Sequence, residues 1–242
     1  MPRTESGRAS NSRTPSLRGR LTARPIAPTQ GSFAVSHIGR PVATPGLQRL
    51  RSDARRDTLL YVPKGYAADR SLPLIIMCHG AVGNARGGLA PMLPWADEAG
   101  ILLLATASLH GSWDLIHDGY GPDVARLDQA LTQTFAEFKV DKTRLAIGGF
   151  SDGASYALSL GLDNGDLFTH IIALSPRFMA PNAPVGRPNI YISHGRTDNV
   201  LPIDACSRSL VPLLKDSGYS VRYHEFDVGH TVPPEIAHEA AT

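Results

Sequence analysis

Short apolar runs alternate along most of the chain with segments whose apolar residues recur at helical spacing. Apolar runs with few polar positions are typical of strands buried on both faces of a parallel sheet. They predict strands over residues 58–62, 72–78, 101–105, 145–147, 171–174, 189–193 and 220–226. The helical spacing predicts helices over residues 89–99, 124–138, 155–162, 204–217 and 234–241. This alternation indicates an α/β domain with a mostly parallel sheet.

The first 56 residues lack this pattern and differ in charge from the rest. They contain eleven arginines, no lysine and two acidic residues, a net charge of +9, whereas the remainder has 13 basic and 20 acidic residues, a net charge of −7. We therefore expect an Arg-rich, largely disordered extension over residues 1–56 and one catalytic domain over residues 57–242. The extension has no apolar signal-peptide core, but its composition also suits an organelle transit peptide.

Composition sets further expectations about surroundings and partners. The two cysteines, Cys78 in an apolar run and Cys206, do not indicate a disulfide framework, which fits a cytoplasmic location. No apolar run approaches the roughly 18 residues of a membrane span. A nucleic-acid-binding arm would need interleaved aromatic residues, and Phe33 is the only one before Tyr61, so we expect no nucleic-acid partner. The oligomeric state stays open.

The strongest chemical signal is a serine flanked by glycines. Gly149, Ser151 and Gly153 form a G-x-S-x-G pattern between a predicted strand and a predicted helix. Such a strand-to-helix turn forces the serine into a strained backbone conformation, so the residues two before and two after it must be small. The serine hydroxyl then lies near a helix N-terminus. The pattern predicts a nucleophile, with a purely structural turn as the alternative.

Two later loops, each just after a predicted strand, add a carboxylate and an imidazole. Asp198 lies in the first loop and His230 in the second. The order Ser151, Asp198, His230 is the order expected of a serine hydrolase with this topology. His230 would accept the serine proton, and Asp198 would orient the imidazole. Asp204 is a rival acid, but we expect it to be a helix N-cap.

An acyl-transfer site also needs at least two donors for the developing oxyanion. We assign them to the backbone N–H groups of Ala81, in the loop after an early strand, and of Asp152, after the nucleophile. His79 and Trp113 are candidates for the substrate pocket, with a core or surface position as the alternative for Trp113. Asp123 is expected to be a helix N-cap.

Together these motifs resemble the α/β-hydrolase superfamily, and within it the phospholipase/carboxylesterase group with its polyhydroxybutyrate-depolymerase and feruloyl-esterase relatives. The resemblance is carried by His79-Gly80, Gly149-Phe150-Ser151-Asp152-Gly153, His194-Gly195 with Asp198, Val200 and Pro202, and Gly229-His230. It implies an α/β-hydrolase fold without a large lid, in which helices flank the sheet. It also implies a serine esterase that acts on small to medium esters through an acyl-enzyme, with no metal or organic cofactor.

Two departures from this group matter. Its acyl-protein thioesterases usually carry Gln or Met after the nucleophile, where this chain has Asp152, and its terminal helix is often longer. Acyl transfer and cleavage of a thioester, polyester or amide remain alternatives for the same site. A non-catalytic binding protein of this fold is the alternative of another class. A dinucleotide-binding enzyme is set aside, because residues 80–85 do not fit G-x-G-x-x-G.

Overall fold

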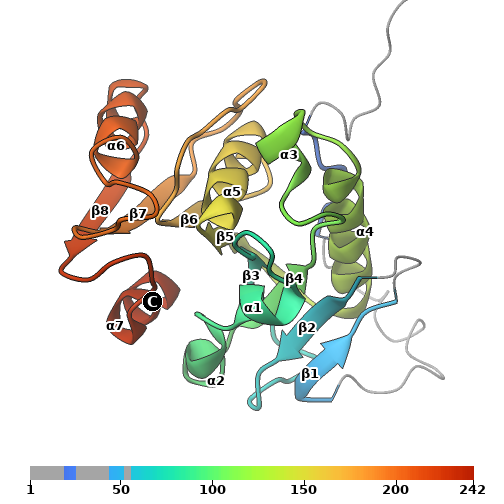
Figure 1. Cartoon of the computed structure of the whole chain (residues 1–242). Helices are drawn as coiled ribbons and strands as arrows, with labels where there is room; N and C mark the ends of the chain where they lie inside the picture. Colours follow the sequence, from blue (N-terminus) through green and yellow to red (C-terminus); the bar gives the residue numbers. More distant parts are fainter. Residues whose placement is uncertain (1–18, 26–43, 52–55) are drawn as a thin grey trace, which may run out of the picture.

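Eight strands form one sheet with helices on both faces in the computed structural model, which describes residues 19–25, 44–51 and 56–242 (Figure 1). The strands are β1 (Gly46–Arg49), β2 (Thr58–Val62), β3 (Leu72–Cys78), β4 (Leu102–Thr106), β5 (Val140–Phe150), β6 (His170–Leu174), β7 (Asn189–Gly195) and β8 (Val221–Phe226). Their order in the sheet is β1-β2-β4-β3-β5-β6-β7-β8. Strand β2 is antiparallel to both of its neighbours, and all other pairs are parallel. The predicted mostly parallel sheet is confirmed.

Both faces of the central strands are buried, which explains their continuous apolar runs. On β3, Leu74 and Ile76 belong to one core cluster, whereas Ile75 and Met77 belong to the other. Successive side chains on a strand point to opposite faces, so a strand covered on both sides needs apolar residues at every position.

Each face of the sheet has its own set of helices (Figure 1). The helices are α1 (Ala85–Leu89), α2 (Ala96–Ala99), α3 (Asp114–His117), α4 (Pro122–Glu137), α5 (Asp152–Asp163), α6 (Ser207–Asp216) and α7 (Pro234–Ala241), with a 3-10 turn at Leu93–Trp95. Buried residues of α4, α5 and α6 join the larger core cluster, and those of α1, α2 and α7 join the smaller one. Between β2 and β8, no connection forms a large lid.

One predicted helix is wrong. In place of a helix over residues 89–99, the chain forms α1, the 3-10 turn and α2. Pro91 and Pro94 have no N–H to donate, so a continuous helix would lose hydrogen bonds here. Helix α2 then ends at Gly100, whose φ of +63° lies in the left-handed region that favours glycine.

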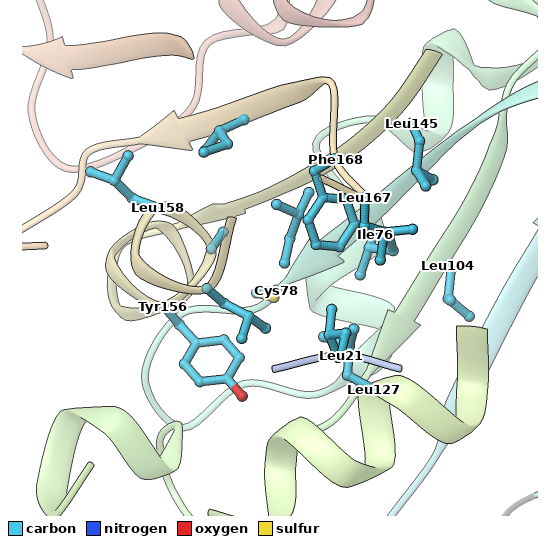
Figure 2. Packing of buried hydrophobic residues seen from close by; sticks show 14 of the residues in the cluster. Leu21, Ile76, Cys78, Leu104, Leu127, Leu145, Tyr156, Leu158, Leu167 and Phe168 are labelled. Atoms are coloured by element: carbon cyan, nitrogen blue, oxygen red, sulfur yellow. The ribbon is translucent and has the colours of Figure 1, made fainter. Parts of the chain in front are cut away.

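Two pieces of the first 56 residues belong to the folded domain. Strand β1 pairs with β2, and Leu21 is 2% exposed within the larger core cluster (Figure 2). The boundary expected at residue 57 therefore lies too late for these pieces. The disorder expected elsewhere in the extension concerns residues 1–18, 26–43 and 52–55, which lie outside the described residues.

Polar contacts hold the N-terminal segment 19–25 against α4 and the end of α5. The Asn164 side chain accepts from the Leu21 N–H at 2.9 Å and donates to the Gly19 carbonyl at 2.7 Å. Two further N–H groups of the segment donate to Asp128 Oδ1, at 2.7 and 2.8 Å. Two arginines of the segment pair with Asp166 at 3.0 and 2.7 Å. The segment is thus fixed by specific hydrogen bonds as well as by burial of one leucine.

Two predictions from composition concern cysteines and the membrane. Cys78 and Cys206 are both buried and unpaired, so they form no disulfide. Within the described ranges, no helix has the length and apolarity to cross a membrane.

Candidate active site

Ser151 occupies the sharp turn between β5 and α5. Its φ of +59° and ψ of −122° are strained for a residue with a side chain. A Cβ added at Gly149 would lie 2.4 Å from the carbonyl carbon of Gly153, and one added at Gly153 would lie 2.2 Å from the Cys78 oxygen. Both glycines are therefore required by the close approach of the turn to β3, as the motif predicts.

The structure brings Ser151, His230 and Asp198 together at the carboxyl ends of β5, β8 and β7. His230 Nε2 lies 2.9 Å from Ser151 Oγ, and His230 Nδ1 lies 2.6 Å from Asp198 Oδ2. An ionised carboxylate only accepts, so Nδ1 carries the proton that it donates to Asp198. Nε2 is then free to accept from the serine hydroxyl. The Phe150 ring packs against the imidazole, with centroids 4.7 Å apart.

The Asp198 carboxylate is held by more than the histidine. Its Oδ1 accepts from the N–H groups of Val200 and Leu201, at 3.0 and 2.8 Å. Burial acts to raise the pKa of Asp198, but the hydrogen bonds from Leu201, His230 and Val200 outweigh it. The pKa therefore lies below its ordinary value, and the side chain stays ionised at neutral pH.

His194 is a second partner of this carboxylate that the sequence analysis did not assign to the site. Its side chain is fully buried, and its Nε2 lies 2.8 Å from the Leu201 carbonyl and 3.3 Å from Asp198 Oδ2. A carbonyl can only accept, so Nε2 carries the proton and Nδ1 accepts from Ser207 Oγ at 2.6 Å. Burial lowers the pKa of His194 and keeps it neutral. The available sequence signal was its position four residues before Asp198.

The two N–H groups assigned to the oxyanion adjoin the serine. Asp152 begins α5, and the first N–H groups of a helix have no partner within the helix. Ala81 follows Gly80, where an added Cβ would lie 3.4 Å from Ser151 Cβ. In the described part of the chain, the Ala81 N–H donates to no protein group. Both groups are thus candidates to bind a developing oxyanion.

The side chains of His79 and Trp113 are buried and contact the backbone of this loop, so their assignment to the substrate pocket is wrong. Trp113 is 0% exposed, stacks on Tyr156 at 4.6 Å, and donates from Nε1 to the His79 carbonyl at 2.8 Å. The buried His79 ring accepts from the Ser108 N–H at 2.9 Å and donates to the Gly80 carbonyl at 2.7 Å. Burial lowers the pKa of His79, which fits this neutral form. Both side chains are buried and hold the loop of residues 79–83 in place.

The loop of residues 79–83, which carries the candidate oxyanion donor, also contacts the loop of residues 108–113. The Val82 N–H donates to the Gly111 carbonyl at 2.6 Å. Arg56 joins the two loops, because its terminal nitrogens donate to the carbonyls of His110 and Gly83 at 2.7 and 2.8 Å. The position of the Ala81 N–H thus depends on contacts across both loops.

Asp152 contributes a side chain to this junction. Its Oδ2 accepts from Ser112 Oγ at 2.6 Å, which links the residue after the nucleophile to the 108–113 loop. The two residues are forty positions apart in sequence, and no sequence signal predicted the pair.

The N-caps expected at Asp123 and Asp204 are wrong. Asp123 lies inside α4, where its buried carboxylate accepts from the N–H groups of Leu109 and Asp114, at 2.8 and 3.1 Å. Asp204 precedes the N-cap of α6 and pairs with Arg208 at 2.9 Å. Neither side chain contacts the site, so Asp198 has no rival from Asp204. In residues 19–25, 44–51 and 56–242, no group of three or more His, Cys, Asp or Glu side chains could hold a metal ion.

Comparison with known proteins gives a family and a fold. Residues 123–242 match the sequence model of the phospholipase/carboxylesterase family. Similar solved structures include a phospholipase/carboxylesterase from Dyadobacter fermentans (17% identity, TM-score 0.59, covering 79% of this chain and 97% of that one). An acetyl xylan esterase from Aspergillus awamori is 16% identical, with a TM-score of 0.60 and coverage of 78% and 95%. An S-formylglutathione hydrolase from Staphylococcus aureus is 12% identical, with a TM-score of 0.65 and coverage of 81% and 96%. A search of curated proteins finds no match.

Proposed function

We propose that this chain, whose residues 123–242 match the phospholipase/carboxylesterase family, hydrolyses carboxylic esters with Ser151 as nucleophile, His230 as base and Asp198 as orienting acid. The observation that carries the proposal is the continuous chain of contacts from Ser151 Oγ through the imidazole to Asp198, at 2.9 and 2.6 Å. A serine hydroxyl is a weak nucleophile at neutral pH, and this chain of contacts supplies the base that it needs.

In the first half-reaction, His230 Nε2 takes the hydroxyl proton while Ser151 Oγ attacks the ester carbonyl carbon. The carbonyl electrons move onto oxygen, and the N–H groups of Ala81 and Asp152 donate to that oxyanion. Loss of one such donor typically costs about 3 kcal/mol of transition-state stabilisation. The N-terminus of α5 adds a favourable dipole. The ionised Asp198 stabilises the imidazolium that forms.

Collapse of the tetrahedral intermediate breaks the bond to the leaving alcohol. The imidazolium donates its proton to the alkoxide, and the acyl group stays on Ser151 Oγ. A water molecule then attacks the acyl carbon, with His230 again as base, and releases the carboxylic acid. No cofactor takes part in these steps.

Small to medium esters are the substrate class that the fold favours. The connections between β2 and β8 form no large lid that would cover a long acyl chain. Two similar structures are named for an acetyl and a formyl group, which supports a small acyl part.

The proposal is tested with p-nitrophenyl acetate and butyrate. Ser151→Ala should abolish hydrolysis, because it removes the hydroxyl that forms the proposed acyl-enzyme. Ser217→Ala, at the exposed C-cap of α6, should be fully active. A fluorophosphonate probe should label the wild-type protein and not Ser151→Ala. Full activity of Ser151→Ala would refute the assignment. Absence of labelling in the wild type would favour a non-catalytic binding protein.

Acyl transfer and cleavage of thioesters, amides or polyesters would use the same acyl-enzyme. A panel of thioesters, peptides and polyester films, with competing alcohols, separates these reactions from ester hydrolysis.

A further inference from the structure

Asp152 follows the proposed nucleophile directly in sequence, at a position where hydrolysis of a neutral ester needs no negative charge. The backbone N–H of this residue is a candidate oxyanion donor, but the side chain is not required for that role. A carboxylate close to a developing oxyanion raises the energy of the transition state through like-charge repulsion. The side chain therefore calls for an explanation of its own.

Its surroundings place this carboxylate at the junction of the nucleophile turn and two loops. Ser112, 6% exposed, donates to Asp152 Oδ2 at 2.6 Å. The neighbouring Gly111 carbonyl accepts from Val82, next to the candidate oxyanion donor Ala81. Asp152 itself is only half-buried, so part of its side chain faces solvent beside Ser151.

The pair offers acceptors and no donors to a ligand. An ionised carboxylate has about four acceptor positions, of which Ser112 fills one. The Ser112 hydroxyl has already given its hydrogen to Asp152, so its oxygen can only accept. The cation that adjoins these loops, Arg56, donates instead to the carbonyls of His110 and Gly83. A substrate group bound here must therefore be a donor, and a cationic donor is bound best.

We propose that the Asp152 carboxylate, which Ser112 holds in place, is a specificity subsite that favours esters carrying a cationic group, such as an ammonium, close to the scissile bond and disfavours anionic esters. This inference rests on the proposed ester hydrolysis at Ser151. An exposed charge pair contributes up to about 1 kcal/mol, so the preference between cationic and anionic esters should change by roughly fivefold when the charge is removed.

Three p-nitrophenyl esters of similar size test the subsite: butyrate, which is neutral, 3-aminopropanoate, which is cationic, and hemisuccinate, which is anionic. The measured quantity is the ratio of kcat/KM for the cationic ester to that for the anionic ester. Asp152→Asn removes the charge but keeps an oxygen that can accept from Ser112. It should lower the ratio by about fivefold at low salt and by less at high salt, where charges are screened. Asp216→Asn, a matched change at an exposed position of α6, should leave the ratio unchanged.

Ser112→Ala distinguishes the effect of the Asp152 charge from that of the hydrogen bond between the two loops, because it removes the hydrogen bond and keeps the carboxylate. The ratio should stay close to the wild-type value in this variant. A ratio within twofold of wild type in Asp152→Asn would overturn the proposal. An equal loss of kcat/KM on all three esters in both variants would also overturn it. That result would mean that the hydrogen bond between Ser112 and Asp152 only holds the two loops together.

Fluorophosphonate labelling of Ser151 distinguishes this failure from failure of the proposed function. Labelling together with an unchanged ratio would refute the subsite and leave the hydrolase intact. A wild-type protein that is neither labelled nor active on any of the three esters would refute both.

Discussion

Leu21 should contribute strongly to stability although it lies in an otherwise Arg-rich region. Its side chain is 2% exposed in the same core cluster as Leu127 and Phe168. Replacement of a buried leucine by alanine typically costs about 2–5 kcal/mol. No helix or strand holds the N-terminal segment, so the segment can relax around a smaller side chain. We therefore expect Leu21→Ala to reduce the free energy of unfolding by about 2–3 kcal/mol, near the lower end of this range.

The assay is urea unfolding of the full chain followed by circular dichroism. For a domain of this size, the expected loss corresponds to a fall in Tm of roughly 5–10 °C. The matched control is Leu213→Ala on α6, where the leucine is 54% exposed and the change should be within about 0.5 kcal/mol. Equal stabilities of the two variants would show that the segment does not dock on the core in solution, and the reasoning would be refuted.

Three further predictions concern the turn, the acid and a buried carboxyl pair. Gly153→Ala should lower the free energy of unfolding by more than about 2 kcal/mol and remove most of the activity, because its Cβ would lie 2.2 Å from the Cys78 oxygen. The measurement is thermal unfolding, and the control is Gly65→Ala, where no atom lies within 4 Å of the added Cβ. His194→Ala should lower kcat on the order of tenfold with little change in KM, since Asp198 loses a donor. His194→Gln should recover part of that loss. Equal kcat values for His194→Ala and the wild type in steady-state assays would contradict this role. Burial, and then repulsion from Asp123, raise the pKa of Asp114 from 3.8 to about 6, so the folded protein binds its proton more tightly than the unfolded chain. Stability should therefore fall by about 3 kcal/mol as pH rises from about 4 to about 6. Urea unfolding of Asp114→Asn at several pH values should lack that decrease.

Local patterns in the sequence were sufficient for seven of the eight strands, all but β1, and for the triad candidates. Apolar runs report burial on both faces, so the limits of most central strands were predicted within two residues. Strand β5 begins five residues before the predicted run of 145–147 and ends three residues after it. The candidate nucleophile, acid and base could be found because each follows a strand end. In an open parallel sheet those ends share one edge, so the pattern itself predicts proximity.

Contacts between distant segments could not be predicted in the same way. Leu21 packs in the core because Asn164 and Asp128 accept from its segment, and neither acceptor differs in sequence from an ordinary surface residue. The bond between Ser112 and Asp152 also joins two loops whose relative position only the folded sheet determines. Trp113 was ambiguous because a tryptophan after a strand can face a pocket or the core, and only its stacking on Tyr156 decides between them.

The strained backbone of Ser151 sets stability against activity at a single residue. Its φ of +59° and ψ of −122° lie in a region that glycine adopts without strain. For a residue with a side chain, this conformation typically reduces stability by about 1–3 kcal/mol. An alanine here keeps the Cβ and so keeps the penalty, whereas a glycine removes it. Ser151→Gly should therefore raise the free energy of unfolding while it removes the proposed nucleophile. The serine at this position costs stability, which fits the role proposed for its hydroxyl.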